Sequence, residues 1–345
     1  MKALVKTARG PGNLELRDVP RPEPLPKWVR VRVAYGGICG TDLHILHDTF
    51  PYWPPVILGH EFTGTVEALG EGVDPAWMGR RVVCEPHSLA CGECYLCRRG
   101  HIQLCAAKRS PGWGIDGAFA SHVAVPAMLL HRVPDSVPDR VAALAEPMAI
   151  VLSAMERAPV RPGDAVVIMG PGPVGILAAL AARATGAGPV LIVGRDADKS
   201  RLDAAGRLGF DTAGDPEAAR AWTADATESR GADLVIDASG AAVALALGVE
   251  ILRRRGRLLA VGMGGRPDIP FPWDLAVTRA LDIAFSMSSN YTAWDPAIGM
   301  LARHADAAAS LVTEFALSDW QAAFRAVEEQ SVLKAIIRPD GGASS

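Results

Sequence analysis

The spacing of apolar residues changes along the chain. Up to about residue 145, short apolar runs are interrupted by Gly and Pro, a pattern that indicates short strands joined by loops. The predicted strands of this region are 28–37, 61–70, 80–86 and 119–126. The first part of the chain is therefore expected to be rich in β-strands and loops.

A different pattern follows. The stretch 165–194 reads as an apolar strand, a glycine turn, an alanine-rich helix and a second apolar strand, which together make a βαβ unit. The alternation continues, with predicted strands at 232–240, 256–265 and 281–288 and predicted helices at 201–209 and 241–256. Such alternation favours the α/β class with a doubly wound parallel sheet.

The last part of the chain returns to a mixed pattern. Helices are predicted at 295–311 and 318–330 and a final strand at 333–339, before a Gly/Ser-rich end at 341–345. A chain of 345 residues with 49% hydrophobic residues is too long for one ordinary core. We therefore expect two domains.

Charge and the length of apolar runs argue against two classes of partner. The formal net charge of −3, from 35 Lys and Arg against 38 Asp and Glu, gives no electrostatic reason to bind nucleic acid. The N-terminal apolar run is broken at Lys6, and no segment offers about 18 uninterrupted apolar residues. We expect no leader and no membrane span, and hence a cytoplasmic protein.

The cysteines favour metal binding over disulfides, because thiols in a reducing compartment stay unpaired. Four of the six cysteines follow the pattern C-x2-C-x2-C-x7-C, at Cys91, Cys94, Cys97 and Cys105. Gly92 and Gly100 allow the tight turns that bring the four thiolates together. Four thiolates fill the tetrahedral shell of zinc, so this site is predicted to be structural. The long last gap disfavours an iron–sulfur cluster.

A second motif, GPGPVG, follows the first strand of the βαβ unit and opens its helix. The predicted cofactor-binding residues are Gly170, Gly172, Pro173, Val174 and Gly175. In this context the first glycine makes the turn, the second lets a pyrophosphate approach, and the third lets the helix pack closely on the strand. Free N–H groups at the start of the helix favour phosphate binding, so we predict a dinucleotide site.

The end of the second strand bears on the choice of nicotinamide cofactor. An Asp or Glu there binds the ribose of NAD, whereas the 2′-phosphate of NADP needs a nearby Arg. The strand is expected to end at Gly194, and Arg195 follows directly. These residues favour NADP, while Asp196 keeps NAD open if the strand runs two residues longer.

Cys39 and His60 lie in glycine-rich turns of the first region. The motifs CGTDLH, GHEFTGTVEALG, the four-cysteine segment and GPGPVG, in this order, resemble the zinc-dependent medium-chain dehydrogenase/reductase superfamily. The resemblance covers essentially the whole chain and is closest in motifs to sorbitol (polyol) and threonine dehydrogenases. It implies a GroES-like catalytic domain from 1–149 and 287–345, with a Rossmann coenzyme domain from 150–286.

The same resemblance implies a second, catalytic zinc. By the family pattern, Cys39 and His60 are zinc ligands, and Glu61 is an adjacent acid that can bind or approach the metal. The segment LAEPMAIVLSAMERA resembles the EP segment of sorbitol dehydrogenases, which implies Glu146 as a further ligand, directly or through water. The resemblance thus implies two zinc ions per chain.

Thr41 and His44 match the family positions that carry a proton away from the substrate. The implied activity is hydride transfer between a secondary alcohol, of polyol or sugar type, and NAD(P). L-Threonine, another amino alcohol or an aminocyclitol stays open as substrate, and so does a non-catalytic protein that senses its cofactor. Phe50, Trp53 and Trp113 are expected on the substrate wall. Members of the family are usually homodimers or homotetramers.

Overall fold

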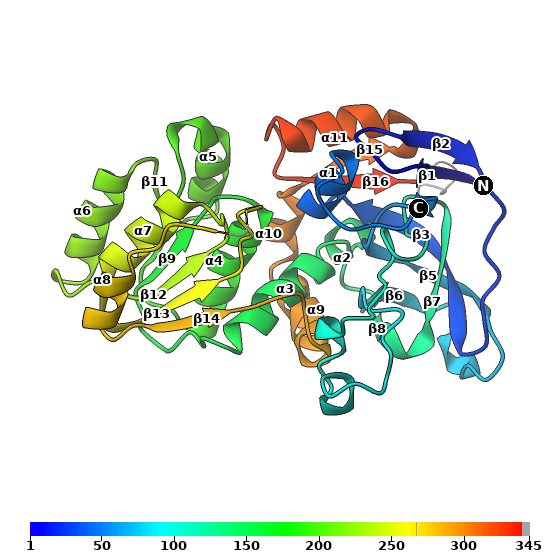
Figure 1. Cartoon of the computed structure of the whole chain (residues 1–345), viewed down its shortest axis with the longest axis horizontal. Coiled ribbons are helices and arrows are strands. Elements are labelled where there is room, and N and C mark those ends of the chain that lie inside the picture. The colour runs from blue at the N-terminus through cyan, green and yellow to red at the C-terminus, as the bar shows by residue number, and fades with distance from the viewer. Residues whose placement is uncertain (267, 340–345) are drawn as a thin grey trace. The chain divides into compact units, whose positions relative to one another are not determined.

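The computed structural model describes residues 1–266 and 268–339, and it divides into two compact units. Unit 1 comprises Met1–Glu146 and Asn290–Ser345, and unit 2 comprises Pro147–Ser289 (Figure 1). The Gly/Ser-rich end at 341–345 lies outside the described residues. The chain therefore leaves unit 1 once and returns to it.

Unit 1 is built on strands, as its broken apolar pattern predicts. Its strands are β1 (Lys2–Lys6), β2 (Leu14–Asp18), β3 (Trp28–Gly37), β4 (Val56–Ile57), β5 (Glu61–Leu69), β6 (Arg81–Cys84), β7 (His122–Pro126), β8 (Leu130–Arg132), β15 (Val312–Ala316) and β16 (Lys334–Arg338). One sheet has the order β2-β1-β4, and a larger one has the order β15-β16-β3-β5-β6-β8, with β7 also paired to β3. The late strand β16 pairs with the early strand β3, which joins the two parts of the unit.

The helices of unit 1 are short. They are α1 (Gly40–Leu46), α2 (Asp139–Ala142), α9 (Trp294–Arg303), α10 (Ala305–Ala309) and α11 (Trp320–Glu328), with 3₁₀ helices η1 (Pro75–Trp77), η2 (Cys97–Arg99), η3 (Ile102–Leu104), η4 (Ala127–Leu129), η6 (Tyr291–Ala293) and η7 (Leu317–Asp319). The longer α3 (Ala145–Met155) begins in unit 1 and continues into unit 2. An apolar cluster that includes Ile38, Leu58 and Phe324 packs the start of α1 against α11 and β16.

Unit 2 contains one six-stranded parallel sheet in the order β11-β10-β9-β12-β13-β14. Its elements are β9 (Val166–Met169), α4 (Pro173–Thr185), β10 (Val190–Val193), η5 (Asp196–Asp198), α5 (Lys199–Arg207), β11 (Asp211–Ala213), α6 (Pro216–Ala226), β12 (Ala232–Asp237), α7 (Ala242–Ile251), β13 (Leu252–Ala260), α8 (Trp273–Thr278) and β14 (Asp282–Phe285). Counted from β9, this is the 3-2-1-4-5-6 order of the Rossmann fold. The predicted fold class, a β-rich domain plus a doubly wound parallel sheet, is confirmed.

Two segment predictions were wrong in detail. The helix predicted at 241–256 ends at Ile251, and β13 already begins at Leu252, because Leu252 pairs with Ala232 of β12. The register between the two strands then shifts before Arg257. The helix predicted at 295–311 is two helices, separated at His304, whose φ of −122° is not helical. The N-terminal run is the strand β1, in which Lys6 is fully buried.

Within the described residues, no helix has both the length and the apolar character needed to cross a membrane.

Candidate zinc and dinucleotide sites

Three donor side chains meet at the end of β3 in unit 1. The ligand atoms of Cys39, His60 and Glu61 all lie within 4.8 Å of one another. Strands β3 and β5 are antiparallel, and Gly37 near the end of one is opposite Glu61 at the start of the other. A Cβ atom on Gly37 would lie 2.2 Å from Oε2 of Glu61, so this position needs glycine. The strand register therefore brings together residues that are far apart in sequence.

Cys39 is held by the helix that follows it. It is the N-cap of α1, and its backbone N–H donates to Oδ2 of the buried Asp42 at 2.9 Å. Burial, and then the nearby Glu61 carboxylate, raise the pKa of the Cys39 thiol. A cation at this point reverses that balance, because a positive charge stabilises the thiolate.

The donor set is one that suits zinc. His60 and Glu61 are 4% and 1% exposed, and Nδ1 of His60 has no hydrogen-bond partner among the described residues. A buried polar atom without a partner is costly, and a metal ion relieves that cost. Thiolate, imidazole and carboxylate are the three donor types that zinc takes in proteins, so the residues present fit a Zn²⁺ ion.

Glu146 is the second residue of α3 and is 4% exposed. Its Oε2 has no hydrogen-bond partner among the described residues, and burial together with the charge of Glu61 raises its pKa to about 7. It is not part of the group of described donors whose atoms lie within 4.8 Å of one another. In that group the carboxylate is that of Glu61.

Lys334 belongs to the same cluster, although the sequence analysis did not single it out. It lies on β16, is 4% exposed, donates to the carbonyl of Ile38 at 2.9 Å and forms an ion pair with Glu61. Burial opposes its charge, but the charges of Glu61 and Cys39 outweigh burial and raise the pKa of Lys334. A lysine inside the apolar strand LKAIIR was the signal that could have found it.

Thr41 and His44 both lie on α1, three residues apart and hence on one side of the helix. The hydroxyl of Thr41 is 3.7 Å from Sγ of Cys39, and Nδ1 of His44 is 3.1 Å from the hydroxyl of Thr49. No hydrogen bond joins Thr41 to His44 in the part of the chain that the structure describes.

Aromatic rings adjoin the donor cluster. The ring of Trp113 makes edge contacts with His60, at 5.1 Å between centroids, and with Phe50, at 5.5 Å. The backbone N–H of Trp53 donates to the carbonyl of Trp113, while the guanidinium of Arg109 lies 3.8 Å from the Trp53 ring centroid. These contacts bring Phe50, Trp53 and Trp113 into one wall beside His60.

Four of the other five cysteines form a separate group, Cys91, Cys94, Cys97 and Cys105, whose sulfur atoms lie within 4.8 Å of one another. Gly92 and Gly100 both adopt positive φ, at 73° and 82°, as their turns require. Backbone N–H groups of Cys94 and Glu93 point at Sγ of Cys91 and lower the pKa of that thiol to about 6. Four converging sulfur atoms fit a closed tetrahedral zinc site.

The glycine turn of unit 2 has the geometry of a dinucleotide motif. Gly170 follows β9 with φ of 104°, Gly172 is the N-cap of α4, and Pro173 and Val174 form its first turn. A Cβ on Gly175 would lie 1.9 Å from the carbonyl oxygen of Gly170, whereas a Cβ on Gly172 would meet nothing within 4 Å. Gly175 thus allows close packing within the turn, and the space beside Gly172 is open to a ligand.

Gly194 directly follows β10, and a Cβ there would lie 2.9 Å from Cγ of Pro171. Arg195 is 70% exposed, and its guanidinium donates to both oxygens of Asp198, at 3.0 and 3.2 Å. Asp198 was not among the residues expected from the sequence. This carboxylate holds the arginine side chain in one orientation at the end of β10.

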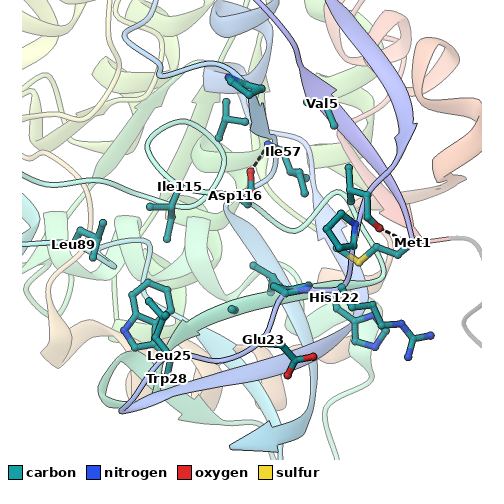
Figure 2. Close-up of a pocket in the computed structure, with 18 residues that line it drawn as sticks. Met1, Val5, Glu23, Leu25, Trp28, Ile57, Leu89, Ile115, Asp116 and His122 are labelled. Atoms are coloured by element: carbon teal, nitrogen blue, oxygen red, sulfur yellow. Dashed lines mark hydrogen bonds between the residues drawn. The ribbon is translucent and has the colours of Figure 1, made fainter. Parts of the chain in front are cut away.

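Unit 1 also contains an apolar hollow of about 550 Å³, shown in Figure 2. Val5, Trp28, Ile57 and Ile115 line it, and Asp116 accepts a hydrogen bond from the backbone N–H of Ile57. None of the candidate zinc ligands is among its described lining residues. The hollow is therefore distinct from the donor cluster.

Comparison with known proteins matches both units. Residues 25–135 match the family model of the alcohol dehydrogenase GroES-like domain, and residues 173–303 match that of zinc-binding dehydrogenases. The chain is 36% identical to a sorbitol dehydrogenase of Halalkalibacterium halodurans, over 98% of this chain and 99% of that protein. It is 34% identical to an L-threonine 3-dehydrogenase of Anaeromyxobacter dehalogenans, over 94% of each. The solved structure of the alcohol dehydrogenase TADH from Thermus sp. ATN1 superposes with a TM-score of 0.88 at 30% identity, over 98% of this chain and all of that one.

Proposed function

The chain belongs to the zinc-dependent medium-chain dehydrogenase/reductase superfamily, and we propose that it transfers hydride between a secondary alcohol of polyol or sugar type and NADP. The observation that carries the proposal is the donor cluster of Cys39, His60 and Glu61, with Glu146 buried nearby. Three protein donors leave a fourth position of a tetrahedral zinc for substrate, whereas the four-cysteine group leaves none.

A bound Zn²⁺ would supply Lewis acidity toward the alcohol oxygen, and a bound nicotinamide would accept the hydride. In this proposal Cys39 and His60 hold the metal, with Glu61 or Glu146 as the carboxylate donor. The four-cysteine group of Cys91, Cys94, Cys97 and Cys105 holds a second, structural zinc. The ion pair between Lys334 and Glu61 supports a place for the Glu61 carboxylate at the catalytic metal, because it holds that side chain within the donor cluster.

Proton removal is assigned to α1. Thr41 would take the hydroxyl proton of the substrate while releasing its own hydroxyl proton, and His44 would pass that proton to solvent by way of the cofactor ribose. The proximity of the Thr41 hydroxyl to Sγ of Cys39, at 3.7 Å, supports the first step. The exposure of His44 supports the second, because a proton donor to water must reach water.

The dinucleotide is assigned to unit 2, with the pyrophosphate at Gly170, Gly172 and Gly175 and the start of α4. NADP is proposed over NAD for two reasons. Gly194 puts no carboxylate directly after β10, and Arg195, oriented by Asp198, presents a guanidinium to a 2′-phosphate. The two compact units accordingly correspond to the catalytic and coenzyme domains.

A homo-oligomer, dimer or tetramer, is part of the proposal. Strand β14 lies at the edge of the sheet in unit 2, and Phe285 and Met287 there are 71% and 51% exposed. An unpaired strand edge with exposed apolar side chains favours pairing with a second chain. A cytoplasmic location is proposed because the six cysteines form no disulfide, and such a compartment keeps thiols reduced and open to metal binding.

Threonine or another amino alcohol is the second candidate substrate, favoured by the similarity to an L-threonine 3-dehydrogenase. A panel of polyols, sugars and amino alcohols, each with NADP and NAD, decides between the candidates. We expect the highest kcat/KM with a polyol and NADP. A preference for threonine supports the second candidate, and a preference for NAD contradicts the assignment of Arg195.

The variant Cys39→Ser tests the donor cluster. We expect turnover to be lost and the zinc content to fall from about two to about one ion per chain, because the four-cysteine site does not depend on Cys39. The matched control is Cys84→Ser, since Cys84 is buried in β6 and belongs to neither described donor group. Retained activity, or the loss of both ions, contradicts the assignment.

A further inference from the structure

A lysine that follows the four-cysteine group lies beside the donor cluster. The backbone N–H of Lys108 donates to the carbonyl of Cys105 at 3.0 Å, and that of Arg109 donates to Leu89 at 2.9 Å. These bonds fix the chain directly after the last cysteine. The backbone at Lys108 is therefore positioned by the folded four-cysteine segment.

The ammonium of Lys108 and the imidazole of His60 contact the same tryptophan. Nζ of Lys108 is 5.9 Å from the ring centroid of Trp113, whose ring lies 5.1 Å from that of His60. A short carbon chain can bridge the two sides of one indole ring. Lys108 thus lies within reach of a substrate that binds at the donor cluster.

Lys108 is partly buried and has no ion-pair partner in residues 1–266 and 268–339. Burial lowers its pKa, which the negative charge of Glu146 and then that of Cys105 oppose. Neither group forms an ion pair with Lys108 in the described part of the chain, and Cys105 is assigned to the structural zinc in the proposed function. A half-buried ammonium that contacts an aromatic ring but forms no ion pair among the described residues is stabilised further by an anion.

We propose that Lys108 binds an anionic group of the substrate, so that the substrate is a secondary alcohol that also carries a phosphate or a carboxylate. This inference rests on the proposed function, because it assumes that the alcohol binds at Cys39 and His60. Trp113 packs against the carbon chain between the two ends. The other cation of this segment, Arg109, lies over the Trp53 ring and is engaged there.

The test compares neutral and anionic substrates of matched shape. The wild-type enzyme and the variants Lys108→Met and Lys108→Arg are each assayed with sorbitol, sorbitol 6-phosphate and gluconate. We expect wild type to prefer one of the anionic compounds, and which one identifies phosphate or carboxylate as the group that binds. Lys108→Met is expected to lower kcat/KM for that compound about 10- to 100-fold, chiefly through KM, and to leave sorbitol within about twofold.

Lys108→Arg is expected to retain most of the preference, because it keeps the positive charge. The matched control is Lys2→Met, which removes an exposed lysine from β1. It is expected to leave kcat/KM unchanged for the neutral and the anionic compounds alike. A wild-type preference for sorbitol overturns the proposal. An equal loss for neutral and anionic compounds in Lys108→Met also overturns it, since that pattern indicates a role through Glu146.

A second measurement separates this inference from the proposed function. Inorganic phosphate is titrated calorimetrically into the zinc-loaded wild type and into Lys108→Met. Weaker phosphate binding in the variant supports the Lys108 assignment even where no alcohol in the panel is oxidised. Identical phosphate binding in the two proteins contradicts it, whatever the turnover.

Discussion

Lys334 and Glu61 form an ion pair in the interior of unit 1, beside Cys39. Each charge alone is costly in that setting, and each has the other as its partner. The pair also joins the last strand, β16, to the start of β5. Its contribution to stability therefore depends on both members being present.

We predict that Lys334→Met lowers the free energy of unfolding by about 3–5 kcal/mol, because it leaves the Glu61 carboxylate buried and unpaired. Urea denaturation of the zinc-free protein measures this without interference from the metal. The double variant Lys334→Met/Glu61→Gln is the control and is expected to recover much of the loss. A loss below about 1 kcal/mol in the single variant, the range of an exposed pair, contradicts this account.

At the scale of elements, the glycines in the turn between β9 and α4 are alike in sequence but have different structural roles. Gly175 is required by packing, since its α-carbon faces the carbonyl oxygen of Gly170. Gly172 has open space around it and no positive φ, so the fold alone does not require glycine there. The need for glycine at that position comes from a ligand that approaches the backbone.

A matched pair of variants separates these roles. Gly172→Ala is expected to keep the melting temperature of wild type within about 2 °C while weakening NADPH binding about tenfold or more. Gly175→Ala is expected to lower both the melting temperature and the affinity for NADPH, because α4 must move away from β9. Fluorescence titration with NADPH and thermal unfolding measure the two effects. Normal NADPH binding by Gly172→Ala contradicts the dinucleotide assignment.

Sequence reasoning anticipated the elements whose signals are local. The βαβ unit, the strand 28–37 and the C-x2-C-x2-C-x7-C group each contain their own pattern, and the structure has them. The end of α7 was misplaced because the three consecutive arginines at 253–255 carry no apolar period that separates the end of a helix from the start of a strand. Lys334 and Asp198 were missed because their partners are fixed by strand pairing and by a turn, which composition does not report.

At the scale of the whole molecule, exposed apolar side chains occur on both units. Phe285 at the edge strand β14 and Tyr95 in the four-cysteine segment are each 71% exposed. Only the first lies on a strand with a free edge in the described sheet. That difference favours β14 as the contact between two chains.

We predict that light scattering gives at least twice the chain mass of 36.3 kDa for wild type, and that Phe285→Asp shifts the population toward one chain. A buried charge at a chain contact opposes association. Tyr95→Asp is the matched control, equally exposed and expected to leave the dimer intact. If only Tyr95→Asp separates the chains, the contact lies in unit 1 and the assignment to β14 is wrong.

The division of unit 1 into two stretches of sequence also constrains how the protein is made. Strand β16 supplies Lys334 to the donor cluster and pairs with β3, which is synthesised about 300 residues earlier. A chain still emerging from the ribosome therefore holds Cys39, His60 and Glu61 without the ammonium that neutralises Glu61. Unit 2, which is continuous in sequence, is complete before that point. The appearance of β16 is thus the event that completes the candidate donor cluster.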